Sequence, residues 1–393
     1  MRMPSNSVKT VIWKRNRRCG LPRYATDRVQ NTLEERGGYM KKQDELLRMI
    51  AVCGELPSYL AGPVVGSDSY AAALITRLKQ EGYLSVRSRD GYKGYVLREK
   101  GRRYLLERYE GDTAFFLRGS AQTMHVKSEA NKRVRLYRMS EVWVFLWKAG
   151  VCIFQSQKPS WEDGFGKNGV ETAVYYGSGE YKGDSEAIKG SRACGVLLAG
   201  KSAYVVYNTM EQRMKWAKKM ERSMRTWTEK ALLKRGSLWM ADALIFGKNM
   251  GFLLELLESD GGIRKTLFQV DDVYERYYYV PMREEAELQM WLLSDEAKKK
   301  QLYGFLCGVL SRRREKEHEI CDGYDNEENP VYFCHELELR RLLRIRQESA
   351  WHPCGIVVCL DYQEEALRAY FGAQVKIQAV IAKKAAEYLR QDG

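Results

Sequence analysis

The chain has 393 residues, of which 45% are hydrophobic and 30% charged, and its formal net charge is +14. This composition excludes a disordered protein, because the apolar residues suffice for the cores of two or three domains. No apolar run approaches the roughly 20 residues that cross a bilayer, and the N-terminal segment lacks the apolar region of a secretion signal. We therefore expect a cytoplasmic protein without membrane contact.

The net charge is confined to the first third of the chain. Residues 1–140 contain 28 Lys and Arg against 14 Asp and Glu, whereas residues 141–393 contain 37 of each. A protein that is basic only for solubility would spread the excess over its length. The distribution therefore indicates one segment that binds a polyanion, and nucleic acid is the polyanion we expect.

Residues 1–40 form a basic arm with aromatic residues between the cations. Arg15, Arg17 and Arg18 stand near Trp13 and Tyr24 in the sequence. Such a segment is suited to tracking phosphates or to entering a minor groove. The alternative is an arm that only keeps the protein soluble.

Residues 41–112 show the element order of a winged helix. Apolar residues at helical spacing predict three helices, at residues 42–54, 58–61 and 69–81. Ser67 or Asp68 can cap the third helix. Alternating residues on both sides of a turn at residues 90–91 then predict a hairpin, and residues 100–109 return to helix.

Residues 78–84 and 94–105 resemble the recognition-helix, wing and following-helix pattern of bacterial winged-helix proteins. In that fold the third helix enters the major groove and the hairpin lies along the DNA backbone. An apolar stripe is expected to face the core, formed by Ala71, Leu74, Ile75 and Leu78. The residues of this helix expected to face DNA are Ser69, Tyr70, Ala73, Thr76, Arg77 and Gln80.

Among these residues, Arg77 is the best candidate for a bidentate guanine contact. On the hairpin, Arg87, Arg89 and Lys93 are expected to meet phosphates, with Tyr92 beside them. The alternative is that the module contacts a protein, since winged helices do this as well and surface arginines are often simply solvated.

Residues 113–235 are expected to form an α/β domain. A strand at residues 171–176 leads into a glycine-rich loop, and a hairpin at 196–207 is followed by a long helix at 210–233. Methionines on one side of that helix are expected to pack in the core. The fold class expected for the whole chain is mixed α/β.

Taken together, the winged helix and this following hairpin resemble the replication-relaxation family of mobile elements. The resemblance implies a domain similar to restriction endonucleases, in which a hairpin holds a divalent metal through an acidic residue and an acid-x-Lys pair. Residues 191–195 and 204–208 carry no carboxylate, so we expect an inactive domain. One acid-x-Lys string, Glu180-Tyr181-Lys182, lies in the glycine-rich loop, where a rigid metal site is not expected.

Residues 236–393 are expected to form a second α/β domain with a mainly parallel sheet, since short apolar strands alternate with helices. Strands are expected, among other places, at residues 266–270, 355–360 and 375–380. No phosphate-binding glycine fingerprint occurs. His318, Cys321, His335, His352 and Cys354 cluster here without the spacing of a zinc site, so buried thiols are the expectation. We expect neither a metal nor a cofactor.

The sequence therefore predicts a sequence-specific, double-stranded DNA-binding protein of a bacterial mobile element, acting in replication, transfer or their regulation without catalysis of its own. A protein of a replication or transfer complex and a second copy of this chain are further partners to consider. Two alternatives stay open. One is a metal-dependent nicking enzyme, in which Glu180 or a tyrosine of residues 277–279 would act, and the other is a winged-helix transcriptional regulator.

Overall fold

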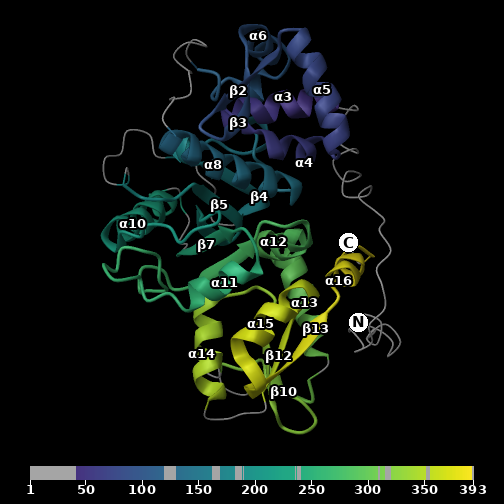
Figure 1. Cartoon of the computed structure of the whole chain (residues 1–393). Coiled ribbons are helices and arrows are strands. Elements are labelled where there is room, and N and C mark those ends of the chain that lie inside the picture. Colours follow the sequence, from purple (N-terminus) through teal and green to yellow (C-terminus); the bar gives the residue numbers. More distant parts are fainter. Residues whose placement is uncertain are drawn as a thin grey trace. The chain divides into compact units, whose positions relative to one another are not determined.

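The computed structural model describes residues 41–118, 130–161, 169–181, 188, 190–234, 236, 240–308, 310–314, 320–350 and 355–391 (Figure 1). The chain is mixed α/β. Its described residues form two compact units. The N-terminal unit holds residues 41–148 and 152–160, and the C-terminal unit holds residues 149–151 and the chain from Trp161 onward. The predicted arm lies outside the described residues, including Arg15, Arg17 and Arg18.

The N-terminal unit begins with three helices, α3 (Lys42–Cys53), α4 (Ala61–Val65) and α5 (Asp68–Gln80). The apolar stripe predicted for α5 is confirmed, because Ala71, Leu74, Ile75 and Leu78 are all buried. Ser67 is the N-cap, with its hydroxyl oxygen accepting from the Tyr70 amide at 3.4 Å. The burial of this stripe holds α5 against the unit and leaves its other side in solvent.

The predicted hairpin follows as β2 (Leu84–Arg89) and β3 (Tyr92–Leu97). Asp90 and Gly91 form its turn with φ of 52° and 77°, the left-handed conformation that tight hairpin turns need. A short strand that the sequence did not indicate, β1 (Leu56–Pro57), pairs with β3, so the sheet order is β1-β3-β2. Two helices complete this stretch, α6 (Glu99–Arg108) and α7 (Glu110–Thr113).

The N-terminal unit extends past the boundary expected at residue 112. Helix α8 (Ala130–Lys148) belongs to it, because Arg133 of α8 is 1% exposed and forms an ion pair with the fully buried Glu55. Residues 152–160 also pack here, with the Phe154 ring 3.8 Å from the guanidinium of Arg48. These contacts join segments that are distant in the sequence.

The C-terminal unit contains two five-stranded sheets. The first has the order β4-β5-β6-β7-β8 and is formed by β4 (Val170–Gly177), β5 (Gly195–Gly200), β6 (Ser202–Asn208), β7 (Ala241–Gly247) and β8 (Tyr277–Pro281). The predicted hairpin is confirmed as β5 and β6, which pair antiparallel. β7 pairs in parallel with β6 across helix α10 (Lys218–Lys234), so the sheet continues through the boundary expected between residues 235 and 236.

The second sheet has the order β13-β12-β11-β10-β9. It is formed by β9 (Arg312–Arg313), β10 (Gly323–Tyr324), β11 (Pro330–Phe333), β12 (Gly355–Leu360) and β13 (Val375–Val380). β11, β12 and β13 are parallel as expected, whereas β9 and β10 add an antiparallel edge. The parallel strands are connected by α14 (Leu339–Ser349) and α15 (Glu364–Phe371).

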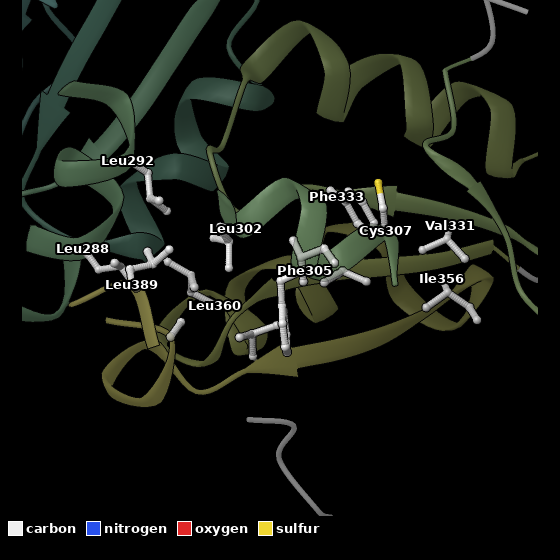
Figure 2. Packing of buried hydrophobic residues seen from close by; sticks show 14 residues of the cluster. Leu288, Leu292, Leu302, Phe305, Cys307, Val331, Phe333, Ile356, Leu360 and Leu389 are labelled. Atoms are coloured by element: carbon white, nitrogen blue, oxygen red, sulfur yellow. The ribbon is translucent and has the colours of Figure 1, made fainter. Parts of the chain in front are cut away.

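Three further helices pack their apolar side chains over this sheet, namely α12 (Glu287–Ser294), α13 (Glu296–Cys307) and α16 (Ala382–Gln391). Figure 2 shows the resulting core, which includes Leu302 and Phe305 of α13, Leu360 of β12 and Leu389 of α16. Within the described residues, none of the helices combines the length and apolar character that crossing a membrane requires.

The C-terminal unit differs from the predictions in two predicted elements and in two additional helices. Residues 266–270 form no strand but a single bridge between Leu267 and Lys215. The helix expected from residue 210 begins only at Lys218, because Met210 adopts a positive φ of 55° and the bridge at Lys215 holds the chain extended. Short helices α9 (Ser178–Tyr181) and α11 (Met250–Leu257) form where none was expected.

Candidate nucleic-acid interface

The outer face of α5 carries the residues that the sequence predicted for it. All six are exposed: Ser69, Tyr70, Ala73, Thr76, Arg77 and Gln80. Tyr70 is 47% exposed although it is a large aromatic residue. Lys79, which the sequence reasoning left out, is exposed on the same helix. The face therefore combines neutral hydrogen-bonding groups with an aromatic ring and two cations.

Arg77 is an exposed cation of this face and has two polar partners at the surface. Its side chain is 55% exposed and donates to the Gln43 side chain at 3.0 Å, while Glu81 lies 3.9 Å from Nε. The Thr76 hydroxyl instead donates to the Ala72 carbonyl at 2.9 Å, within the helix. Arg77 is thus held loosely at the surface, and an incoming acceptor needs to replace only exposed partners.

The hairpin does not present its three predicted cations together. Paired residues of antiparallel strands point to the same side, and the register pairs Arg89 with Tyr92 and Lys93 with Ser88. Arg87 and Arg89 therefore lie on one face of the hairpin and Lys93 on the other. The Arg89 side chain is 65% exposed beside Asp90, Lys93 is exposed, and Arg87 is half-buried. Arg89 and Lys93 remain available for phosphate contacts.

A buried polar cluster beneath the hairpin was not foreseen from the sequence. Arg133 donates from Nε to both carboxylate oxygens of Glu55, at 3.2 and 3.3 Å, and from Nη1 to the Arg89 carbonyl at 3.0 Å. Tyr137 donates to Glu55 at 3.0 Å, and its pKa is raised by burial and by that carboxylate. The ring of Tyr92 packs edge-on against Tyr137, with centroids 5.5 Å apart. The cluster fixes the hairpin relative to α8.

Of the residues considered for a nicking enzyme, the structure describes Glu180 and the tyrosines of β8. Glu180 accepts from the Gly177 amide at 2.8 Å, and Lys182 lies outside the described residues. In the part of the chain that the structure describes, no group of three or more His, Cys, Asp or Glu residues is placed to hold a metal ion. The strands β5 and β6 bring no carboxylate toward one another.

The tyrosines of β8 lie in the interior of the C-terminal unit. Tyr277 and Tyr279 are fully buried, and burial raises the pKa of both phenols. The Tyr279 hydroxyl donates to the Asn249 carbonyl at 2.6 Å, and the Tyr277 hydroxyl donates to Asp271. A nucleophile must reach its phosphodiester, so these side chains are better explained as core residues.

The expected thiol cluster is partly described. Cys321, Cys334 and His335 are buried, whereas His318, His352 and Cys354 lie outside the described residues. Burial raises the pKa of the Cys334 thiol to about 12 and lowers the pKa of His335. Both groups are therefore neutral at pH 7, which suits a packed interior.

A small polar cavity of about 190 Å³ lies in the C-terminal unit. It is lined by three cations, Arg276, Lys299 and Arg341, and each has a carboxylate partner. Arg276 is 2.9 Å from Asp242, Lys299 is 2.8 Å from Glu336, and Arg341 pairs with Asp322. Burial raises the pKa of Asp242 to about 6 against the opposing effect of Arg276. The charges of this cavity are compensated internally.

Comparison of the chain with models of known families, with curated proteins and with solved structures gives no match, so the interface is interpreted from its own geometry.

Proposed function

We propose that the N-terminal unit is a winged helix that binds double-stranded DNA in a sequence-specific manner. The observation that carries the proposal is the division of α5 into a fully buried apolar stripe and an exposed face of hydrogen-bonding residues. The order α3, β1, α4, α5, β2, β3 and the sheet β1-β3-β2 support it. In such a fold α5 enters the major groove.

The chemistry of the face suits base reading. Arg77 can donate two hydrogen bonds to guanine, Gln80 can pair with adenine, and Tyr70 and Ala73 offer apolar contact to a thymine methyl group. Arg89 and Lys93 at the hairpin tip supply phosphate contacts, which position the protein without reading sequence. The excess of cations over residues 1–140 contributes a general attraction to DNA.

We further propose that the chain acts as a DNA-binding protein of a bacterial mobile element, in replication, transfer or their regulation, and in the bacterial cytoplasm. The resemblance to the replication-relaxation family supports this role. The hairpin of β5 and β6, followed by α10 and a parallel strand, supports a domain related to restriction endonucleases that lacks their carboxylates. A transcriptional regulator would use the same interface on α5.

Selection of bound fragments from a bacterial genomic library by the full-length protein tests the proposal. The selected duplex should be bound more weakly by Arg77→Ala, by about 1–3 kcal/mol, and random duplex should not be affected. Arg103→Ala, at an exposed arginine of α6 in the same unit, is the matched control and should change neither affinity. Failure to enrich any sequence, or equal losses in both variants, would contradict sequence-specific binding through α5.

A further inference from the structure

Helix α10 exposes a cationic face in a part of the chain that is neutral overall. Its 17 residues contain six Lys and Arg against two Glu, although residues 141–393 as a whole carry 37 of each sign. The exposed residues Lys219, Arg222 and Lys230 follow one another at helical spacing. A general requirement for solubility would not place this excess on a single helix.

The opposite face of α10 is anchored in the core. Met224, Thr228 and Leu232 are fully buried. Glu221 is also fully buried, and its carboxylate accepts from the Ser191 hydroxyl at 2.6 Å, from the Arg192 amide at 2.9 Å and from the Tyr207 hydroxyl at 2.9 Å. These contacts fix the rotation of the helix about its axis, so the cations on its other side face solvent.

The exposed cations differ in whether they are neutralised. Asp272 pairs with Lys218 and, at 3.1 Å, with Arg222. Within the described residues, Lys219 and Lys230 take part in no ion pair. Two of the four cations along this face therefore keep their full charge, and a third, Arg222, shares one carboxylate that is itself exposed.

The cations border an open groove of about 660 Å³ that also contains hydroxyl groups and one indole. Ser223 and Thr226 line the groove between the cations, and Trp227 lines it as a half-buried ring. Trp227 is stacked on Trp161, with ring centroids 6.1 Å apart and planes within 8°. Tyr181 lies 5.7 Å from the same ring. The indole is thus held rigidly beside the positive charges.

We propose that this groove binds a segment of single-stranded nucleic acid. Lys219, Arg222 and Lys230 contact phosphates along the strand. The Thr226 hydroxyl donates to a phosphate oxygen, whereas the Ser223 hydroxyl already donates to the Lys219 carbonyl at 3.0 Å. Trp227 offers its ring to an unpaired base. A cationic groove with an aromatic platform is the combination that binds single strands, whereas bases in a duplex are already stacked on one another.

The site is separate from the one on α5, because it lies in the other compact unit and needs no base-specific contact. The protein would then hold a specific duplex through one unit and an adjacent unpaired strand through the other. An acidic protein segment would also be attracted by the lysines, but it would gain little from Trp227. Replacing Trp227 therefore distinguishes single-stranded nucleic acid from an acidic protein segment, because only the former should bind more weakly.

The full-length protein and a fluorescent single-stranded 20-mer of thymidine nucleotides provide the experiment, with anisotropy measured over a range of salt concentrations. Reversing both unpaired charges in Lys219→Glu/Lys230→Glu should lower the affinity by at least tenfold. The slope of log K against log salt should fall by about 1.4, because single strands lose about 0.7 per phosphate contact. Trp227→Ala should weaken binding by about 5- to 150-fold.

The matched control is Lys376→Glu/Lys383→Glu, which makes the same change of net charge at two exposed lysines of the C-terminal unit and should leave binding unchanged. Trp227→Phe keeps an aromatic ring and should retain most of the affinity, which guards against misfolding of the alanine variant. Equal losses in the two double variants would overturn the proposal. So would unchanged binding by Trp227→Ala, or equal competition by poly-glutamate.

The result is distinguishable from a failure of the function proposed for α5. Lys219→Glu/Lys230→Glu should bind the selected duplex as the unmodified protein does, and Arg77→Ala should bind the thymidine 20-mer normally. Loss of both activities in either variant would contradict two separate sites.

Discussion

Helices α5 and α10 have the same construction but different surfaces. Each buries one face in the core and turns a polar face to solvent. The face of α5 has two cations among neutral hydrogen-bonding groups, whereas that of α10 has cations at almost every turn. Neutral donors and acceptors distinguish bases, and lysines neutralise phosphates of any sequence. The difference indicates selective recognition by α5 and non-selective retention by α10.

The interior of the molecule uses charge in a third way. Arg133 under the hairpin and the cations of the polar cavity each have a carboxylate partner that is buried or partly buried, so they add little to the external field. Net charge alone therefore does not locate a binding surface. The useful quantity is the charge that is exposed and unpaired, which is why α10 stands out in a neutral unit.

The largest effect is expected at the scaffold of the α5 interface. Glu55→Gln leaves Arg133 buried without a countercharge and should lower the free energy of unfolding of the N-terminal unit by about 3–5 kcal/mol in urea denaturation. The hairpin should lose its anchor. Binding of the thymidine 20-mer by α10 should persist at temperatures where Glu55→Gln and the unmodified protein are both folded.

Glu45→Gln in the same unit serves as the control for this change. Glu45 pairs with Lys42 on α3 at 3.0 Å near the surface, and such a pair contributes about 0–1 kcal/mol. The double variant Glu55→Leu/Arg133→Met removes both charges and should lose less stability than Glu55→Gln. Equal effects of Glu45→Gln and Glu55→Gln would contradict the structural role of the buried pair.

The scaffold under α10 should respond to pH through Asp242, at the start of β7. Its pKa is raised by burial from 3.8 to about 6, so the folded state binds the proton more tightly than the unfolded chain. The stability from protonated Asp242 is present below about pH 4 and is lost as the pH rises through about 6. Asp242→Asn should remove this loss, which amounts to about 2–3 kcal/mol.

Measurement of the free energy of unfolding at pH 4 and pH 7 in both proteins checks this prediction. The asparagine variant should gain relative to the unmodified protein between the two pH values, because all other carboxylates titrate alike in both. A constant difference would show that the pairing with Arg276 fully offsets burial, and a relative loss by the variant would show that the pairing outweighs it.

Local elements were predictable from the sequence where one periodicity and one end signal coincide. The strands at residues 355–360 and 375–380 have the predicted bounds, and the buried stripe of α5 is confirmed residue by residue. The exposed residues of α5 were predicted as those that lie outside its apolar stripe. These features depend on neighbours within one or two turns, which the sequence displays directly.

Features that depend on distant partners were not predictable. Strand β1 has two residues and forms only because β3 lies beside it. The pairing of Glu55 with Arg133 joins positions 78 residues apart, and β7 joins β6 across the expected domain boundary. The cationic face of α10 was hidden by averaging charge over residues 141–393. Its helical spacing is visible in the sequence, so a count along each helix face could have found it.

A smaller effect is expected at the N-cap of α5. Ser67→Ala removes the acceptor of the Tyr70 amide and should cost the N-terminal unit about 1 kcal/mol. Because Ser69 and Tyr70 lie in the first turn, affinity for the selected duplex should fall as well. Asn249→Ala removes the corresponding cap of α11, which accepts from Phe252 at 3.0 Å, and should leave duplex affinity unchanged. Equal duplex affinities of the unmodified protein, Ser67→Ala and Asn249→Ala would contradict a role of α5 in DNA recognition.

The smallest change in stability, but a gain in binding, is expected from Asp272→Asn. Asp272 is exposed and pairs only at the surface, so its loss should leave the unfolding transition in place. Its pKa is lowered by the hydrogen bond from Lys218, so it stays ionised through the neutral range and continuously offsets the charge of α10. Removing it should strengthen binding of the thymidine 20-mer and steepen its salt dependence, since Lys218 and Arg222 then face the phosphates unopposed.

The control is Asp260→Asn, at another carboxylate of the same unit, which should change neither the affinity nor its salt dependence. If Asp272→Asn weakened single-strand binding, the carboxylate would be orienting Arg222 rather than competing with phosphate, and the cations of α10 would act as a fixed array instead of as independent charges.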